Sequence, residues 1–279
     1  MNKQIWLFRK LGLVTLDGNA TFINVFGKKI LSKLHFDFDS RTYRVLRRIY
    51  RRVGKFQRIE LSYSAFGEDQ VLAKYLPELD GRYIDVGAAA PKNGSNTFLL
   101  YERGWKGITI EPIESLIKKH KRIRPRDSQI HACVSNEIGT LITFFQYTAD
   151  DFSTNSVERM VELEKKGITP RLTHLIPNIK LSDLDFKSNP FMPTLLNIDV
   201  EGAELDVLLS NNWDANKPRV IAIEEWTSPI YEKTEVRLFL EQIDYKLVSR
   251  CFLTSIYVHE DYLNTRQEGN SSNFGWFSH

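Results

Sequence analysis

Acidic residues close four separate apolar runs of this 279-residue sequence, and they are Asp85, Glu111, Asp199, and the adjacent pair Glu224 and Glu225. The carboxyl ends of parallel strands meet at one edge of a sheet, which is where such sheets bind ligands. Carboxylates that gather there without partners raise one another's pKa. Such side chains can take a proton from a substrate hydroxyl, bind the ribose of a nucleoside or coordinate a hard cation.

The first of these runs, Tyr83–Val86, leads into a turn of small residues. Gly87 is followed by three alanines, and the next glycine is Gly94. Small residues allow the backbone to approach a nucleoside, and Glu111 at the end of the second run is placed to bind its ribose. A dinucleotide needs the further glycines that this turn lacks, because its pyrophosphate binds bare backbone at a helix N-terminus. The turn therefore favours a cofactor without phosphate, and we expect S-adenosylmethionine.

Strands and helices alternate along residues 62–263. Apolar runs predict strands at residues 83–86, 108–110, 129–134, 194–199 and 219–223. Helical spacing predicts helices at residues 68–76, 96–103, 114–122, 201–209 and 236–243. This alternation predicts an α/β fold with a mostly parallel, doubly wound sheet. Two further strands, at residues 245–249 and 252–258, are expected to close it.

Three segments fall outside this alternation. Residues 141–147 are rich in β-branched and aromatic residues, and we expect an inserted or edge strand there. Residues 148–178 are predicted to form a cover inserted in the sheet domain, irregular from 170 to 177 and followed by a short strand at 179–181. Residues 264–279 are polar, with glycine and serine, and we expect a loosely held tail.

Residues 1–61 form a basic extension in which we find no strand pattern. Residues 1–60 contain 14 Lys and Arg against 4 Asp and Glu, although the net charge of the whole chain is only +3. Residues 40–56 are predicted to form a helix with an apolar stripe. Its other faces carry five arginines, namely Arg44, Arg47, Arg48, Arg51 and Arg52.

Two interpretations of this basic helix remain open. The arginines can meet an anionic surface, which is the inner membrane leaflet or a phosphorylated or acidic substrate. Alternatively, the apolar stripe packs on the main domain and the arginines are solvated. They are not interleaved with aromatic residues, which disfavours nucleic acid as a partner.

The composition, with 42% hydrophobic and 26% charged residues, is that of a globular protein with a sizeable core. The two cysteines, Cys133 and Cys251, lie in apolar runs, which favours buried thiols in a reducing compartment over a disulfide. No run of about 18 apolar residues is present. Arg9 and Lys10 interrupt the apolar N-terminus too early for a signal peptide. We expect a cytoplasmic protein, peripheral to the inner membrane face if its arginines bind lipid.

Several short motifs resemble, in their order, the FkbM-type family of S-adenosylmethionine-dependent methyltransferases. The motifs are Phe66-Gly67-Glu68-Asp69, Tyr83-Ile84-Asp85-Val86-Gly87-Ala88, Ser95-Asn96-Thr97, Gly104-Trp105-Lys106-Gly107-Ile108-Thr109-Ile110-Glu111-Pro112 and Asn197-Ile198-Asp199-Val200-Glu201-Gly202-Ala203-Glu204. They cover roughly residues 62–260, and the last of them is the most specific. The turn from Ala89 to Asn93 departs from the Asn-x-Gly version that is more common in the family.

This resemblance implies a class I methyltransferase fold, which is a Rossmann-like sheet of seven strands with the last strand antiparallel. It implies O-methylation, often of sugar hydroxyls in glycans or natural products, so the expected acceptor is a saccharide or glycolipid. The cofactor contacts that it implies are Asp85, Gly87 and Ala88 on the methionyl side, Glu111 at the ribose, Ser135 near the adenine, and Asn96 and Pro112 within the matching motifs.

Methyl transfer to a hydroxyl needs alignment of the reactants and removal of one proton, because the cofactor already activates the methyl group. We predict Asp199 as the base, with Glu201 second and His174 in the cover able to reach the acceptor. The alternative is that Glu201 caps its helix and Asp199 only orders the loop. A divalent metal held by Asp199, Glu224 and Glu225 is a further option, but acidic groups without known geometry are weak metal predictors, so no metal is favoured.

Two other functions fit parts of the pattern. A nicotinamide-dependent Rossmann oxidoreductase would share the sheet and the ribose-binding acid, but the missing glycines argue against it. A methyltransferase-like fold without catalysis, serving as a membrane-bound adaptor, would keep both the sheet and the basic extension.

Overall fold

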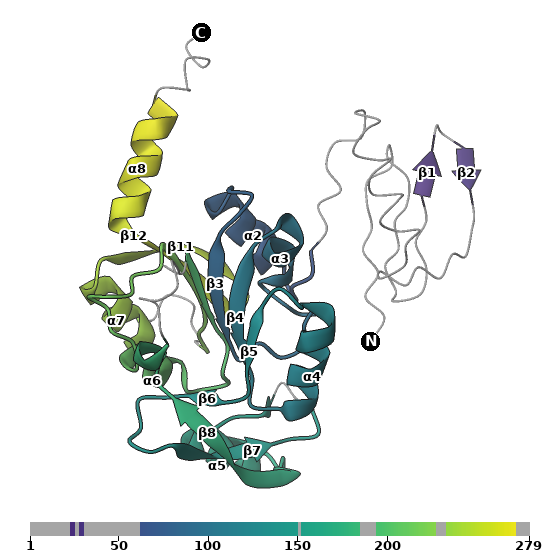
Figure 1. Ribbon diagram of the computed structural model, residues 1–279, viewed down its shortest axis with the longest axis vertical. Coiled ribbons are helices and arrows are strands. Elements are labelled where there is room, and N and C mark those ends of the chain that lie inside the picture. The colour runs from purple at the N-terminus through teal and green to yellow at the C-terminus, as the bar shows by residue number, and fades with distance from the viewer. Residues whose placement is uncertain are drawn as a thin grey trace. The chain divides into compact units, whose positions relative to one another are not determined.

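A computed structural model describes residues 23–25, 28–30, 62–149, 152–184, 194–226 and 233–271 of the chain (Figure 1). The chain divides into two units, Met1–Glu60 and Leu61–His279. In the first unit, β1 (Ile23–Val25) and β2 (Lys28–Ile30) pair antiparallel. We did not predict these strands, because three residues are too few for an alternating pattern to show. The predicted basic helix at residues 40–56, with its five arginines, lies outside the described residues.

The second unit is organised around a seven-stranded sheet with the order β11-β12-β10-β9-β3-β4-β5. Its parallel strands are β3 (Arg82–Val86), β4 (Lys106–Ile110), β5 (Ser128–Ile130), β9 (Leu195–Ile198) and β10 (Val220–Glu224). The last strand, β12 (Thr254–His259), pairs antiparallel with both β10 and β11 (Tyr245–Cys251). The prediction of a seven-stranded α/β sheet with its last strand antiparallel is therefore confirmed.

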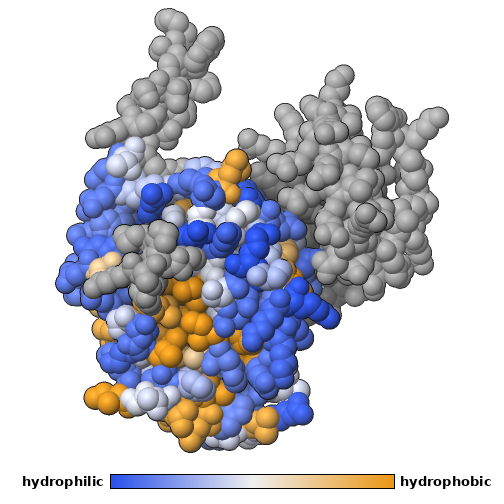
Figure 2. All heavy atoms as spheres, viewed as in Figure 1, coloured by the Kyte–Doolittle hydropathy of each residue, from blue (hydrophilic) through white to orange (hydrophobic). Residues whose placement is uncertain are grey.

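Helices cover both faces of this sheet (Figure 1). On one face lie α2 (Glu68–Tyr75), α3 (Phe98–Arg103) and α4 (Glu114–Ile123), and on the other lie α6 (Glu204–Leu209) and α7 (Glu235–Gln242). Because successive strand residues point to opposite faces, Tyr83 packs in the cluster of α2 and α3, whereas Ile84 packs in that of α6 and α7. Figure 2 shows an apolar area in the middle of one face of the molecule, bordered by hydrophilic residues.

A second, three-stranded sheet has the order β6-β8-β7. It consists of β6 (Cys133–Val134), β7 (Leu141–Gln146) and β8 (Leu172–Ile179), and α5 (Val157–Lys165) lies between β7 and β8 in the sequence. The strand predicted at residues 141–147 is confirmed as β7. It belongs to this inserted sheet and not to the main one.

Three local predictions in this region are wrong. The strand expected at residues 129–134 is divided, because β5 ends at Ile130 and β6 joins the second sheet. Residues 170–177 are not irregular, since β8 pairs with β7 from Leu172 onward. The segment Leu181–Asp183 is a 3-10 helix and not part of a strand. Strand β8 could not be predicted from the sequence, because its own residues do not alternate clearly between apolar and polar. Its partner strand β7 is also separated from it by the whole of α5.

The C-terminal segment also differs from the prediction. Helix α8 extends over Glu260–Ser271, so the expected loose tail begins as a helix. Glu260 and Asp261 lie in its first turn, where carboxylates stabilise a helix through its dipole. Among the helices of the described residues, none combines the length and the apolar character that crossing a membrane requires.

Candidate active site

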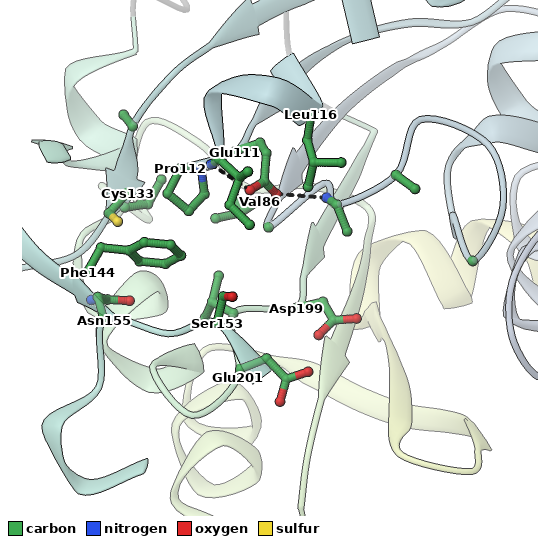
Figure 3. A pocket seen from close by; sticks show the side chains of 18 of the residues that line it. Val86, Glu111, Pro112, Leu116, Cys133, Phe144, Ser153, Asn155, Asp199 and Glu201 are labelled. Carbon is green, nitrogen blue, oxygen red and sulfur yellow. Dashed lines mark hydrogen bonds between the residues drawn. The ribbon is translucent and has the colours of Figure 1, made fainter. Parts of the chain in front are cut away.

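A cavity of about 350 Å³ opens at the carboxyl ends of β3, β4 and β9, next to the three-stranded sheet (Figure 3). Figure 3 shows the carboxylate of Glu111 at one side of this cavity and those of Asp199 and Glu201 toward the other. Residues that line it include Gly87, Ala89, Ala90, Glu111, Pro112, Cys133, Phe144, Ser153, Asn155, Asp199 and Glu201. The site thus combines the turn after β3 with two of the predicted strand-end acids.

Gly87 fixes the position of the predicted base. Its φ of +72° is in the left-handed region, and a β-carbon at this position would lie 1.8 Å from the carbonyl oxygen of Asp199. The Gly87 amide donates to Ile110 at 3.0 Å, and the Asp199 amide donates to Val86 at 3.0 Å. Only a residue without a side chain allows the ends of β3 and β9 to approach this closely.

Glu111 ties the turn after β3 to the end of β4. Its side chain is 4% exposed, and its two carboxylate oxygens accept hydrogen bonds from the amides of Ala89 at 2.9 Å and Ile113 at 2.8 Å. Each carboxylate oxygen can accept more than one hydrogen bond, so this geometry is compatible with binding of ribose hydroxyls. Pro112, the next residue, also lines the cavity as predicted.

Asp85 takes a different place from the one predicted at the methionyl side of a cofactor. The structure buries its carboxylate beneath the turn, where it accepts hydrogen bonds from Asn197 at 2.9 Å and from the Thr97 hydroxyl. Arg124, which is fully buried, lies 3.7 Å from the same carboxylate. Asn96 donates to Asn197 at 3.1 Å and so belongs to this network. Neither Asp85 nor Asn96 is among the residues that line the cavity.

Three further candidates also lie outside the cavity lining. Ala88 is buried and donates its amide to Ile110 at 3.2 Å. Ser135 is fully buried and donates to Asn178 at 3.0 Å. His174, on β8, stacks on Phe144 with ring centroids 5.9 Å apart. Since Phe144 lines the cavity, the side chain of Phe144 lies between His174 and the cavity.

The three acids that follow β9 have different roles. Asp199 and Glu201 line the cavity. Glu204 instead accepts hydrogen bonds from the amides of Val200 at 3.2 Å and Gly202 at 3.1 Å. Glu204 therefore orders the loop, which is the role that the alternative interpretation gave to Asp199.

Glu201 is held in an uncommon backbone conformation, with a φ of +57°. One of its carboxylate oxygens lies 3.7 Å from the guanidinium of Arg159 on α5, which also stands 4.8 Å above the ring of Trp226. Non-glycine residues in the left-handed region cost energy and concentrate at functional sites. Sequence reasoning missed Arg159, because only the folding of the cover brings α5 to this edge of the sheet.

An acidic cluster lies at the ends of β9 and β10. Asp199, Glu201 and Glu224 each place one carboxylate oxygen within 4.8 Å of the others. Burial, together with the charges of Glu201 and Glu204, raises the pKa of Glu224 to about 8. Close carboxylates and a dry environment both favour the neutral acid.

Glu225, which the sequence groups with Asp199 and Glu224, is outside this cluster. Its carboxylate accepts hydrogen bonds from the Tyr257 hydroxyl at 2.9 Å and from the Thr234 hydroxyl at the start of α7. Neighbouring residues of an extended chain point to opposite sides, so Glu224 and Glu225 cannot share one site. Glu201 takes the place that the sequence assigns to Glu225.

The fold and the site define an α/β enzyme that binds a nucleoside cofactor at the carboxyl edge of its sheet. The chain matches the family model described as the methyltransferase FkbM domain over residues 85–247. It therefore belongs to the FkbM methyltransferase family, and it is a methyltransferase that uses S-adenosylmethionine. The resemblance seen in the sequence motifs is confirmed.

Solved structures with weak similarity include other methyltransferases. A TehB-like S-adenosylmethionine-dependent methyltransferase from Corynebacterium glutamicum is 10% identical, with a TM-score of 0.39, over 78% of this chain and 98% of that chain. A methyltransferase from Geobacter sulfurreducens, solved with S-adenosyl-L-homocysteine, is 13% identical, with a TM-score of 0.34, over 72% of each chain. A search of curated proteins finds no match. The family match and the strand order carry the assignment.

Proposed function

We propose that this chain transfers a methyl group from S-adenosylmethionine to a sugar hydroxyl of a glycan or glycan precursor. The observation that carries the proposal is that Gly87 and Asp199 line one cavity, with the main-chain carbonyl of Asp199 packed against Gly87. The cavity has a nucleoside-binding acid at one side and a pair of acids toward the other. This arrangement suits a cofactor and an acceptor that meet near Asp199.

The residues of the cavity fit this cofactor. Gly87 leaves bare backbone beside the cavity, and the buried carboxylate of Glu111 is preorganised by two amides for a ribose. S-adenosylmethionine supplies a methyl group that its sulfonium already activates. The chain then has to align the acceptor and remove its hydroxyl proton.

Asp199 is the residue we assign to the acceptor proton, with Glu201 beside it. Both carboxylates line the cavity, and neither is fully buried. Arg159 forms an ion pair with Glu201 at 3.7 Å and so holds this carboxylate beside Asp199. Trp226 is 53% exposed and lies under Arg159, so it offers a ring face on which a sugar can stack.

Methyl transfer assayed with a panel of saccharides tests this proposal. Release of S-adenosylhomocysteine is measured for the wild-type chain and for Asp199→Asn, and we expect a loss of at least ~100-fold in the variant. Asp214→Asn, an exposed acid in a surface turn, is the matched control and should retain the wild-type rate. Transfer to nitrogen acceptors but to no hydroxyl would contradict the proposal, as would full activity of Asp199→Asn.

We further propose that residues 1–60 bring the enzyme to an anionic membrane surface, where glycolipid acceptors lie. The support is the charge of this segment, with 14 Lys and Arg against 4 Asp and Glu. Co-sedimentation with vesicles that contain anionic lipid should fall when Arg44, Arg47, Arg48, Arg51 and Arg52 are changed to glutamine. Binding that survives this change, or that is equal for neutral vesicles, would reject the membrane role.

A further inference from the structure

The acidic cluster has the composition and spacing of a cation site. Asp199 and Glu201 follow β9, and Glu224 ends β10, which pairs parallel with β9 through Ile223 and Ile198. This pairing brings the two strand ends into register, and one carboxylate oxygen from each acid lies within 4.8 Å of the others. Glu224 belongs to the sheet, and Asp199 and Glu201 lie in the loop that directly follows β9.

Glu224 supplies an independent reason to expect a ligand. Its side chain is only 7% exposed, and its Oε2 atom is buried without a hydrogen-bond partner. A buried carboxylate oxygen that has lost its water costs free energy unless a donor or a cation replaces that water. Arg159 reaches the cluster from its edge, at 3.7 Å from Glu201. A cation between the three acids would satisfy the Glu224 oxygen directly.

We propose that Asp199, Glu201 and Glu224 together bind one hard divalent cation, such as Mg²⁺, Mn²⁺ or Ca²⁺. These ions take carboxylate oxygens at about 2.0–2.6 Å, so oxygens on opposite sides of one ion are roughly 4–5 Å apart. The observed limit of 4.8 Å is within this span. An all-oxygen ligand set disfavours softer ions, which select thiolate or imidazole.

The position of the ion gives it a role in the reaction. Asp199 lines the cavity, so an ion that it holds would also be open to an oxygen atom of the acceptor. A hydroxyl bound to a divalent cation loses its proton more easily, and neighbouring carboxylates can accept that proton. This role rests on the proposed function, whereas the binding of the ion does not.

Titration with Mn²⁺, followed by electron paramagnetic resonance, tests the site on the full chain. We expect one bound ion per chain and a loss of affinity of at least ~10-fold in Glu224→Gln, because ligand charge sets affinity at such sites. Asp199→Asn should show the same loss, which guards against an effect peculiar to one variant. Glu225→Gln is the matched control, since this acid adjoins Glu224 but is outside the cluster, and it should keep wild-type affinity.

Two results would overturn the cation site. One is the absence of a bound Mn²⁺ ion in the wild-type chain, and the other is equal affinity in Glu224→Gln and wild type. Calorimetry with S-adenosylhomocysteine in the presence of a chelator separates this proposal from the proposed function. If the chain binds S-adenosylhomocysteine in the chelator but binds no Mn²⁺ in the titration, the cation site is rejected and the proposed function is not. If the chain binds Mn²⁺ but methylates no saccharide, the acceptor class is rejected and the cation site is not.

Discussion

The carbonyl oxygen of Asp199 occupies the space in which Gly87 would carry a β-carbon, with only 1.8 Å between the two positions. This contact joins the turn after β3 to the loop after β9, and both segments line the cavity. It also explains why the turn has a glycine at this one position and alanines after it. The next three residues do not have to make room for another strand end.

Gly87→Ala should therefore damage both stability and cofactor binding. The added methyl would clash with backbone, and φ is +72° at this position, so we expect a loss of ~3 kcal/mol or more in unfolding free energy. Calorimetry should show at least ~10-fold weaker binding of S-adenosylhomocysteine. Gly167→Ala is the control, because its φ of +77° is similar but no atom lies within 4 Å of the added carbon. It should cost only about 1–2 kcal/mol and leave binding intact, and equal effects of the two variants would contradict this explanation.

Glu111→Gln should weaken cofactor binding and also cost about 1–3 kcal/mol in unfolding free energy, because one of the two buried amides loses its acceptor. The amide can still accept a hydrogen bond on one side, but its NH₂ group cannot accept from Ala89, Ile113 or a ribose hydroxyl. We expect S-adenosylhomocysteine to bind at least ~10-fold more weakly, or about 1.4 kcal/mol, in calorimetry. Glu114→Gln, an exposed acid on α4 with 63% side-chain exposure, should bind like wild type. A wild-type affinity in Glu111→Gln would remove this residue from the ribose site.

The strand-end acids show how far the sequence could predict this site. Asp199 and Glu111 were predictable, because each ends an apolar run and the carboxyl ends of parallel strands share one edge. Asp85 ends a run in the same way, yet its carboxylate faces Arg124 in the interior. The sequence could not reveal this, since the buried arginine comes from a helix end elsewhere in the chain. Identical local patterns therefore led to different roles.

The acidic cluster and the fold of the cover could not be predicted from the order of residues along the chain alone. Choosing between Glu224 and Glu225 requires the phase of β10, and an all-buried strand gives no alternation from which to read it. Arg159 meets Glu201 only after β7 and β8 have paired and positioned α5. The main sheet was predictable because its strands and helices follow one another, whereas the inserted sheet joins distant segments.

Cys133 should react far more slowly with iodoacetamide than Cys251 in the folded chain. Burial raises the pKa of the Cys133 thiol to about 12, with Glu111 adding to the effect, and the side chain is 5% exposed. Cys251 is only partly buried. Peptide mass spectrometry at pH 8 should show at least a ~10-fold difference in rate, because the thiolate is the reactive form.

Two controls accompany this alkylation experiment. In urea the two cysteines should react at equal rates, since the difference comes from the fold. S-adenosylhomocysteine should slow Cys133, which lines the cavity, and leave Cys251 unchanged. Equal rates in the folded chain would show that the cavity wall opens readily at β6.

Asp127 should make the stability of the fold depend on pH in an unusual direction. Its carboxyl group accepts hydrogen bonds from the Tyr83 hydroxyl at 2.5 Å and from the Gly107 amide at 2.9 Å, and Arg124 lies 3.8 Å away. These groups favour the charged form, but burial outweighs them and raises the pKa from 3.8 to about 6. The folded chain thus holds a proton that the unfolded chain releases between these two values. Stability from this group is present below pH 4 and is lost as the pH rises through 6.

Comparison of Asp127→Asn with wild type isolates this effect, because the other carboxyl groups titrate alike in both chains. Urea unfolding at pH 4.5, where the folded Asp127 is mostly protonated and is neutral like Asn, gives the reference difference in unfolding free energy. By pH 7 wild type should have lost roughly 2 kcal/mol of unfolding free energy relative to Asp127→Asn. Asp214→Asn, at an exposed turn, should show a constant difference. A difference that grows with pH would mean that the donors outweigh burial and that the folded carboxyl group is the stronger acid.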